Sequence, residues 1–168
     1  MCDVPAGSMS SNGTRESEQA AGQIMTADGR DGHVVDLRLA LSAHAPGEAR
    51  DRAGSWLDAV GAHPDLQRDV LIAVSELVTN AVTHAASAPH VLLTADGRHL
   101  RVEVRDDSAD PPIRREGTSA GGFGVRLVGE LAVRWGWTPI AGGGKAVWAE
   151  FDTDRTRTAR GDAADGAQ

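Results

Sequence analysis

The residues from Asp65 to His84 constrain the fold more than any other part of the chain. Aliphatic side chains recur there every three or four positions, which is the period of an amphipathic helix. At about 1.5 Å per residue, such a helix spans about 30 Å and can cross a small domain. Its apolar face contains Val70, Leu71, Val74, Leu77, Val78, Ala81 and Val82.

The other side of this predicted helix is polar. Glu76, Asn80 and either Thr83 or His84 line up there, so that a carboxylate and a carboxamide lie one turn apart. Taken alone, such a pair is more often the solvated stripe of an amphipathic helix than a functional site. The pair becomes informative only if other parts of the chain supply complementary groups.

Size and charge exclude several classes of function. The chain has 168 residues and a net charge of −7, which fits one domain and argues against a nucleic-acid surface. No apolar stretch approaches the roughly 18 residues that a membrane span requires, and the N-terminus lacks the apolar core of a signal peptide. We therefore expect a cytoplasmic protein without a direct nucleic-acid or membrane partner.

The composition divides the chain into three parts. Residues 1–32 are rich in Ser, Gly, Asp and Glu and lack aliphatic periodicity, which predicts a disordered N-terminal arm. Residues 154–168 have the same character and are predicted to form a disordered C-terminal tail. Residues 33–153 are expected to form the folded domain.

The order of elements within this domain indicates the fold class. Besides the long helix, the patterns predict strands over 34–41, 91–94, 100–104, 134–140 and 146–151, helices over 46–61 and 123–132, and a loop over 108–122. Strands grouped as hairpins favour an α+β fold, a two-layer α/β sandwich with a mixed, mostly antiparallel sheet and helices on one face. A doubly wound sheet, with strict alternation of strand and helix, fits less well.

Two further motifs follow the long helix. The strand 100–104 leads into Asp106, and Gly122-Phe123-Gly124 stands where a helix begins. Glycines at a helix start let the backbone approach a phosphate and present amide donors to it. Each motif is weak alone, because a strand-end Asp often serves turn chemistry and Gly-x-Gly is common in loops.

Together, the motifs resemble a known family. Glu76…Asn80, Asp106 and Gly122-x-Gly124 are similar in order and placement to the N box, first glycine box and second glycine box of the GHKL, or Bergerat-fold, ATPases. That superfamily includes histidine-kinase catalytic domains, gyrase, Hsp90 and MutL. The resemblance covers nearly the whole predicted domain and implies the Bergerat ATP-binding fold.

The segment Ser75 to Ala85 most resembles the single-domain anti-sigma-factor serine kinases. This branch has a histidine-kinase-like ATPase domain without a separate phosphoacceptor helix domain. The resemblance implies an ATP-dependent kinase that phosphorylates a serine or threonine of an anti-anti-sigma (STAS-type) partner and sequesters a sigma factor. Members of the branch commonly form homodimers through their sheets.

The resemblance also assigns roles to individual residues. Asn80 would offer its amide oxygen to Mg²⁺, an ion that keeps most of its waters and takes few protein ligands. Glu76 would orient or deprotonate the group that attacks the γ-phosphate. Asp106 would accept a hydrogen bond from the adenine amino group. The remaining nucleotide contacts would come from Gly122 and Gly124. His84, which follows Asn80 on the helix, is a further candidate for a phosphate contact, and an ordinary histidine on the helix surface is the alternative.

The sequence departs from the family pattern at two places. Ser108 and Asp110 stand where the first glycine box has glycines, and a Thr of the final strand motif is replaced by Ala146. A Thr at this position could form a hydrogen bond beside the adenine and Asp106, and its loss would weaken nucleotide binding by roughly 1 kcal/mol. These departures keep a second hypothesis open, a non-catalytic nucleotide- or partner-binding module of the same fold. A water-attacking ATPase is a third, for which the chain shows no coupling machinery.

Overall fold

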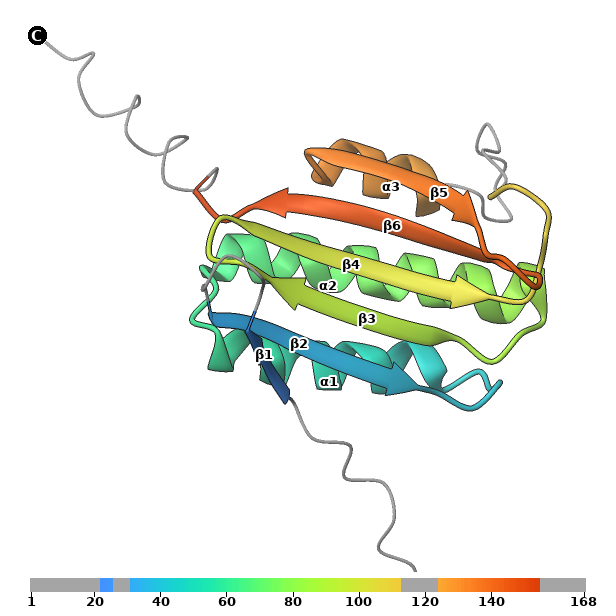
Figure 1. The fold of residues 1–168 in the computed structure, drawn as a ribbon, viewed down its shortest axis with the longest axis horizontal. Helices are drawn as coiled ribbons and strands as arrows, with labels where there is room; N and C mark the ends of the chain where they lie inside the picture. Colours follow the sequence, from blue (N-terminus) through green and yellow to red (C-terminus); the bar gives the residue numbers. More distant parts are fainter. Residues whose placement is uncertain (1–21, 26–30, 113–123, 155–168) are drawn as a thin grey trace, which may run out of the picture.

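The structure is a computed structural model that describes residues 22–25, 31–112 and 124–154. Three helices lie side by side on one face of a six-stranded sheet, whose order is β1-β2-β3-β4-β6-β5 (Figure 1). The strands are β1 (Gly22–Met25), β2 (Asp31–Arg38), β3 (His90–Ala95), β4 (His99–Asp106), β5 (Arg134–Pro139) and β6 (Lys145–Asp152). The helices are α1 (Ala45–Ala59), α2 (Pro64–Asn80) and α3 (Gly124–Leu131).

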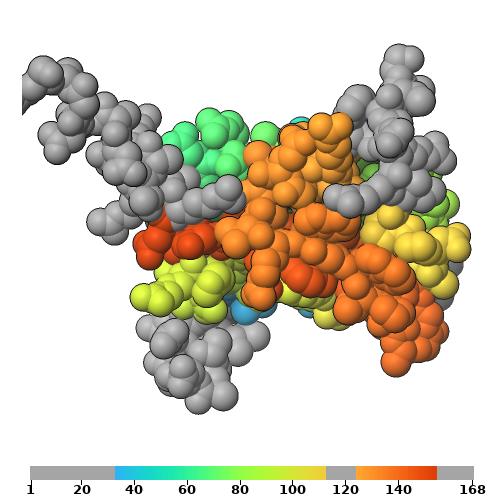
Figure 2. Space-filling model, turned by 90° about the horizontal axis from the view of Figure 1, so that it is seen from above, coloured from blue at the N-terminus to red at the C-terminus, as the bar shows by residue number. Residues whose placement is uncertain are grey.

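The predicted fold class is confirmed. Every strand pairing among the described residues is antiparallel, and one layer of helices covers one face of the sheet. Figure 2, a view from above, shows α3, β5 and β6 together at the edge of the sheet that β5 forms. In the described part of the chain, no helix is long and apolar enough to cross a membrane.

One part of the sheet lies within the predicted N-terminal arm. Residues Gly22–Met25 form β1, which pairs with the first half of β2. The prediction of disorder is therefore wrong for these four residues, because main-chain hydrogen bonding to a neighbouring strand needs no apolar alternation. Residues 31–32 of the predicted arm also belong to the sheet, as the start of β2. The other residues of the arm and residues 155–168 lie outside the described residues, so disorder remains a prediction there.

Helix α2 begins as its sequence indicates. His63 is the N-cap in an extended conformation, and its Nδ1 accepts a hydrogen bond from the main-chain N–H of Asp65 at 3.3 Å. Pro64 occupies the first turn, where its missing N–H has no partner to lose, and Asp65 places a negative charge near the positive end of the helix dipole. These residues fix the start of the helix that carries Glu76 and Asn80.

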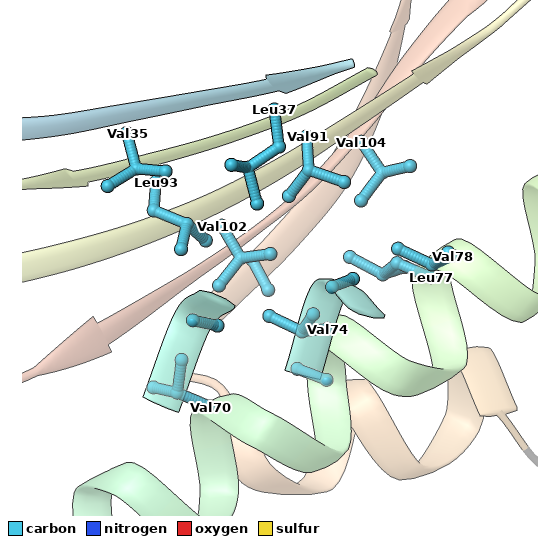
Figure 3. Close-up of a cluster of buried hydrophobic side chains, with 14 of the residues drawn as sticks. Val35, Leu37, Val70, Val74, Leu77, Val78, Val91, Leu93, Val102 and Val104 are labelled. Atoms are coloured by element: carbon cyan, nitrogen blue, oxygen red, sulfur yellow. The ribbon is translucent and has the colours of Figure 1, made fainter. Parts of the chain in front are cut away.

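The core lies between α2 and the sheet (Figure 3). Residues of α2 at helical spacing meet inward-facing residues of β2, β3 and β4, and all are buried: Val35, Leu37, Val70, Val74, Leu77, Val78, Val91, Leu93, Val102 and Val104. Burying an aliphatic side chain of this size contributes about 1.5–3 kcal/mol. The apolar face thus holds α2 against the sheet and leaves Glu76 and Asn80 on its less buried side.

The face of the sheet opposite the helices carries a charged network. Arg101 donates to Glu150 at 2.8 Å and to Glu103 at 2.9 Å, and Arg105 donates to Glu103 at 2.8 Å. Arg134 also donates to Glu150, and the guanidinium of Arg101 lies 4.4 Å from the centre of the Trp148 ring. Partial burial is the largest single influence on Glu103 and raises its pKa, but hydrogen bonds and charges from the two neighbouring arginines together outweigh it. The pKa of Glu103 consequently lies below its usual value of 4.5.

This network predicts a loss of stability in acid. Because the folded-state pKa of Glu103 is lowered, its contribution to stability is complete above about pH 4.5 and disappears as the pH falls through the folded-state pKa. Arg101→Gln should therefore lower the urea midpoint at pH near 7 and have a smaller effect at pH near 3. Arg98→Gln, at an exposed position of the same hairpin, is the control. Equal effects of Arg101→Gln at both pH values would contradict the prediction.

Candidate functional site

A pocket lies where α2 ends beside the ends of β4 and β6. It has an empty volume of about 560 Å³, part of which is open to solvent. Its lining includes Asn80 and His84 from the helix end and Asp106 and Lys145 from the strands. The rest of its lining is Leu77, Val104, Ser108, Asp110, Pro111, Pro112 and Val147. The structure thus brings together three residues that the sequence singled out, Asn80, His84 and Asp106.

A buried ion pair forms the floor of this pocket. The Nζ of Lys145 donates to Oδ1 of Asp106 at 2.8 Å, and their side chains are only 8% and 5% exposed. The same Nζ lies 3.3 Å from the main-chain oxygen of Ser108, and the main-chain N–H of Ser108 donates to Oδ1 of Asp106 at 2.9 Å. The carboxylate predicted to bind a base is therefore already paired with a cation.

The strand register corrects the expectation for Ala146. Asp106 is paired with Lys145, whereas Ala146 is paired with Arg105. Because side chains alternate between the two faces of a strand, Ala146 points away from Asp106, and it does not line the pocket. Lys145 and Val147 share the face toward the helices. The neighbour of Asp106 is a lysine, so the expected loss of a hydrogen bond at Ala146 does not arise.

The turn before β6 brings its backbone against the end of β4. Gly144 has a φ of +82°, and a Cβ at this position would collide with the main-chain oxygen of Asp106 and lie 3.1 Å from the Cα of Asp107. Gly142 in the same turn also has a positive φ, +95°, but open space surrounds the position of its absent Cβ. Of these two glycines, Gly144 is the one whose missing side chain lets the turn approach the end of β4, where Asp106 and Lys145 pair.

Gly144→Ala is accordingly expected to lower the free energy of unfolding by about 2–4 kcal/mol, because strain at a positive φ adds to a backbone collision. Gly142→Ala should lower the free energy of unfolding by about 1–2 kcal/mol, because it adds strain at a positive φ without a backbone collision. Urea denaturation of both variants measures the difference. Equal losses would show that the close approach at Gly144 contributes nothing.

The end of α2 differs from the predicted continuous helix. After Asn80 the chain forms one π turn, η1 (Ala81–Ala85), and then adopts a left-handed conformation at Ala86, whose φ is 48°. Single π turns in helices are frequent at functional sites. This turn leaves both Asn80 and His84 in the lining of the pocket.

Ser87 connects this helix end to the sheet. It is buried, its hydroxyl accepts a hydrogen bond from the N–H of Asp107 at 3.0 Å, and its own N–H donates to the oxygen of Ala81 at 3.3 Å. Asn80 and Asp106 are each adjacent to one of these anchored residues. The serine therefore helps to set the position of the helix end relative to the end of β4.

Glu76 faces a different neighbour. It is not among the described residues that line the pocket, but lies half-buried on the side of α2 that packs against α3. A Cβ on Gly124, the first residue of α3, would collide with Oε2 of Glu76 and lie 3.3 Å from its Cδ. The carboxylate therefore rests against the N-terminus of α3, where helix amide groups and the dipole favour a negative charge.

The donor set of the pocket fits a hydrated cation better than a fully protein-bound one. No group of three or more His, Cys, Asp or Glu side chains with metal-site geometry occurs among the described residues. Asn80 lines the pocket and can supply one neutral amide oxygen. Mg²⁺ bound with phosphates typically needs only one or two protein oxygens, so this arrangement is compatible with it.

Two residues of the candidate site, Lys145 and Ser87, were not predicted from the sequence, and the structure does not place one predicted residue, Gly122. Gly122 lies outside the described residues, so its role remains a prediction. The period-two pattern Lys145, Val147, Ala149 and Phe151 would have placed Lys145 on the inward face, had the strand been started one residue earlier. Ser87 has no comparable signal, because its partner Asp107 is distant in sequence.

Comparisons with known proteins agree with this architecture. The model of the family described as histidine kinase-like ATPase domain matches residues 39–151. Matching solved structures include the RsbU and RsbW domains of Rv1364c from Mycobacterium tuberculosis, with 22% sequence identity and a TM-score of 0.56. The match covers 70% of this chain and 31% of that chain, so the present chain spans about a third of its neighbour's length. None of the curated proteins compared with the chain matches it significantly.

Proposed function

The chain belongs to the histidine kinase-like ATPase domain family, and from this we propose that it is an ATP-binding regulatory protein kinase of the anti-sigma-factor type. The proposed reaction phosphorylates a serine or threonine of an anti-anti-sigma (STAS-type) protein, and the proposed second activity sequesters a sigma factor. The main observation that supports this proposal is that Asn80 and Asp106 line one pocket while Glu76, one turn before Asn80, lies against the first residue of α3. The fold shared with the RsbU and RsbW domain structure agrees with this proposal.

Each residue has a defined task in the proposed reaction. Asp106 binds the base from the floor of the pocket, and Asn80 and His84 lie on the helix end where the phosphates would extend. Asn80 would hold Mg²⁺, which when bound neutralises charge on the phosphates. Gly124, at the N-terminus of α3 and against Glu76, would supply main-chain donors to the phosphates.

Glu76 acts on the phosphoacceptor in this proposal. Its carboxylate orients the acceptor hydroxyl and takes its proton while the acceptor oxygen bonds to the γ-phosphorus. The bond between the γ-phosphorus and the bridging oxygen breaks, and ADP leaves with that oxygen. The position of Glu76 beside α3, outside the pocket lining, supports a role toward a hydroxyl that arrives from a partner protein.

The same structure supports one alternative. Lys145 already neutralises Asp106, and a site with a pre-formed ion pair can serve a non-catalytic binding module of the same fold. Such a module would sequester its partner without phosphotransfer. Nucleotide binding and γ-phosphate transfer therefore have to be measured separately.

Titration calorimetry with ATP and Mg²⁺, and phosphotransfer to candidate anti-anti-sigma proteins with ³²P-labelled ATP, test the proposal. Asn80→Ala is expected to weaken binding of Mg-ATP by at least about tenfold, because one protein ligand is lost. Asp69→Asn, at a partly exposed position on the same helix outside the pocket lining, is the control and should bind as the unmodified chain does. Binding without phosphotransfer to any candidate would favour the non-catalytic module. No binding of ATP at high micromolar concentration would overturn the proposed function.

A further inference from the structure

Among the described residues, the buried pair at the floor of the pocket leaves one acceptor and one donor without a partner. Oδ1 of Asp106 accepts hydrogen bonds from Lys145 and Ser108, whereas Oδ2 accepts none from the described residues and is not among the fully buried atoms that lack a partner. The ammonium group of Lys145 has three N–H donors, of which Asp106 and the main-chain oxygen of Ser108 take two. The floor of the pocket therefore presents an acceptor beside a donor.

From this arrangement we propose that Lys145 widens base recognition, so that the site accepts guanine nucleotides as well as adenine nucleotides. The inference rests on the proposed nucleotide-binding function and concerns its substrate class. An aspartate alone favours adenine, because it accepts from the 6-amino group but repels the 6-carbonyl oxygen of guanine. The lysine beside Asp106 removes this basis for discrimination.

Both purines can satisfy the pair with two hydrogen bonds. Adenine donates its 6-amino group to Asp106 and accepts from Lys145 at N1. Guanine accepts from Lys145 at its 6-carbonyl oxygen and donates its N1–H to Asp106. The order of donor and acceptor along this edge is reversed between the two bases, so guanine meets the pair in an orientation rotated relative to that of adenine. In each orientation Asp106 and Lys145 both have a partner, whereas an unpaired group is what normally rejects the wrong base.

The apolar walls of the pocket add no selection between the purines. Leu77 lies on the helix side, Val104 and Val147 lie on the sheet, and Pro111 and Pro112 follow β4. These side chains offer apolar contact to a planar ring, and both purines present the same ring system to them. Discrimination between the purines therefore falls to the polar lining, in which Asp106 and Lys145 form the buried pair and Asn80, His84, Ser108 and Asp110 are the other described polar residues.

The test measures dissociation constants for ATP, GTP and ITP in the presence of Mg²⁺. Hypoxanthine has the carbonyl and N1–H of guanine but lacks its 2-amino group, so ITP isolates the contact to Lys145. We expect the three values to lie within about tenfold of one another, because each base makes two hydrogen bonds. ATP bound more than about a hundredfold tighter than both GTP and ITP would overturn the inference.

Two variants locate the effect at Lys145. Lys145→Met removes the donor but keeps a side chain of similar length. It should weaken the binding of GTP and ITP by about a hundredfold relative to that of ATP, because the carbonyl oxygen of the base then faces a carboxylate. Lys145→Arg keeps a cationic donor and should retain all three nucleotides within about tenfold of one another. An unchanged ratio of ATP to GTP in a folded Lys145→Met protein would also overturn the inference.

The outcomes separate this inference from the proposed function. Tight binding of ATP with rejection of GTP and ITP would overturn the proposed role of Lys145 in base recognition. It would leave the proposed ATP-dependent kinase function unaffected. No binding of any of the three nucleotides overturns both. If Lys145→Met does not fold, the comparison of ATP, GTP and ITP on the unmodified protein still decides the question.

Discussion

Asp106→Ala is expected to lower the free energy of unfolding by about 3–5 kcal/mol, which is the usual cost of removing one partner from a buried ion pair. The substitution leaves the ammonium group of Lys145, only 8% exposed, with the main-chain oxygen of Ser108 as its remaining partner in the described part of the chain. Urea denaturation followed by circular dichroism measures the loss. The double variant Asp106→Ala with Lys145→Met should recover most of it, because neither charge then remains buried.

A surface ion pair provides the matched control for this experiment. Arg126 and Glu130 lie one turn apart on α3, with side chains 67% and 58% exposed. Glu130→Ala should cost at most about 0.5 kcal/mol, because solvent screens both charges. A loss below 1 kcal/mol for Asp106→Ala would mean that the pocket floor is well hydrated, and would contradict the description of this pair as buried.

Glu76→Gln is expected to reduce the rate of phosphotransfer by about 10²–10⁴-fold while leaving the dissociation constant of Mg-ATP within about threefold of its original value. The amide has nearly the same shape and keeps the contact with Gly124, but it cannot take a proton from the acceptor hydroxyl. Single-turnover transfer to the phosphoacceptor, with binding measured in parallel, separates the two quantities.

Glu130→Gln is the control for this second experiment, because it removes an exposed carboxylate of α3 that is not part of the pocket lining. It should leave both rate and affinity unchanged. A Glu76→Gln variant that transfers phosphate at the original rate would exclude a role as base. Loss of Mg-ATP binding in the same variant would instead indicate that Glu76 supports the nucleotide site itself.

Much of the fold follows from local patterns in the sequence. Helix α2 has a strong 3.6-residue period and a proline in its first turn, and the β3–β4 hairpin turns at Gly97, where Asp96 accepts hydrogen bonds from the N–H groups of Arg98 and His99. The strand β1 could not be predicted in this way. Its residues Gly22–Met25 are held by main-chain pairing to β2, and such pairing leaves no periodic signal.

Those residues of the candidate site that are distinctive by type could be predicted from the sequence. Those that depend on the pairing register of two strands could not. Asn80 and Asp106 carry distinctive groups at element ends, and the structure places both in the pocket. The identity of the residue beside Asp106 depends on the pairing of β4 with β6, where a shift of one residue exchanges Lys145 for Ala146. The π turn after Asn80 was also missed, since helix propensity does not distinguish π from α hydrogen bonding.

Lys145 is the only lysine in the chain, so the pocket floor holds its only side-chain primary amine. A reagent that acylates amines therefore meets a single side-chain target, and reaction there requires the ammonium group to separate from Asp106 and lose a proton. The rate of labelling at this position reports how often the floor of the pocket opens. The chain thus contains a natural chemical reporter of its own pocket, which a bound ligand would protect without any engineered probe.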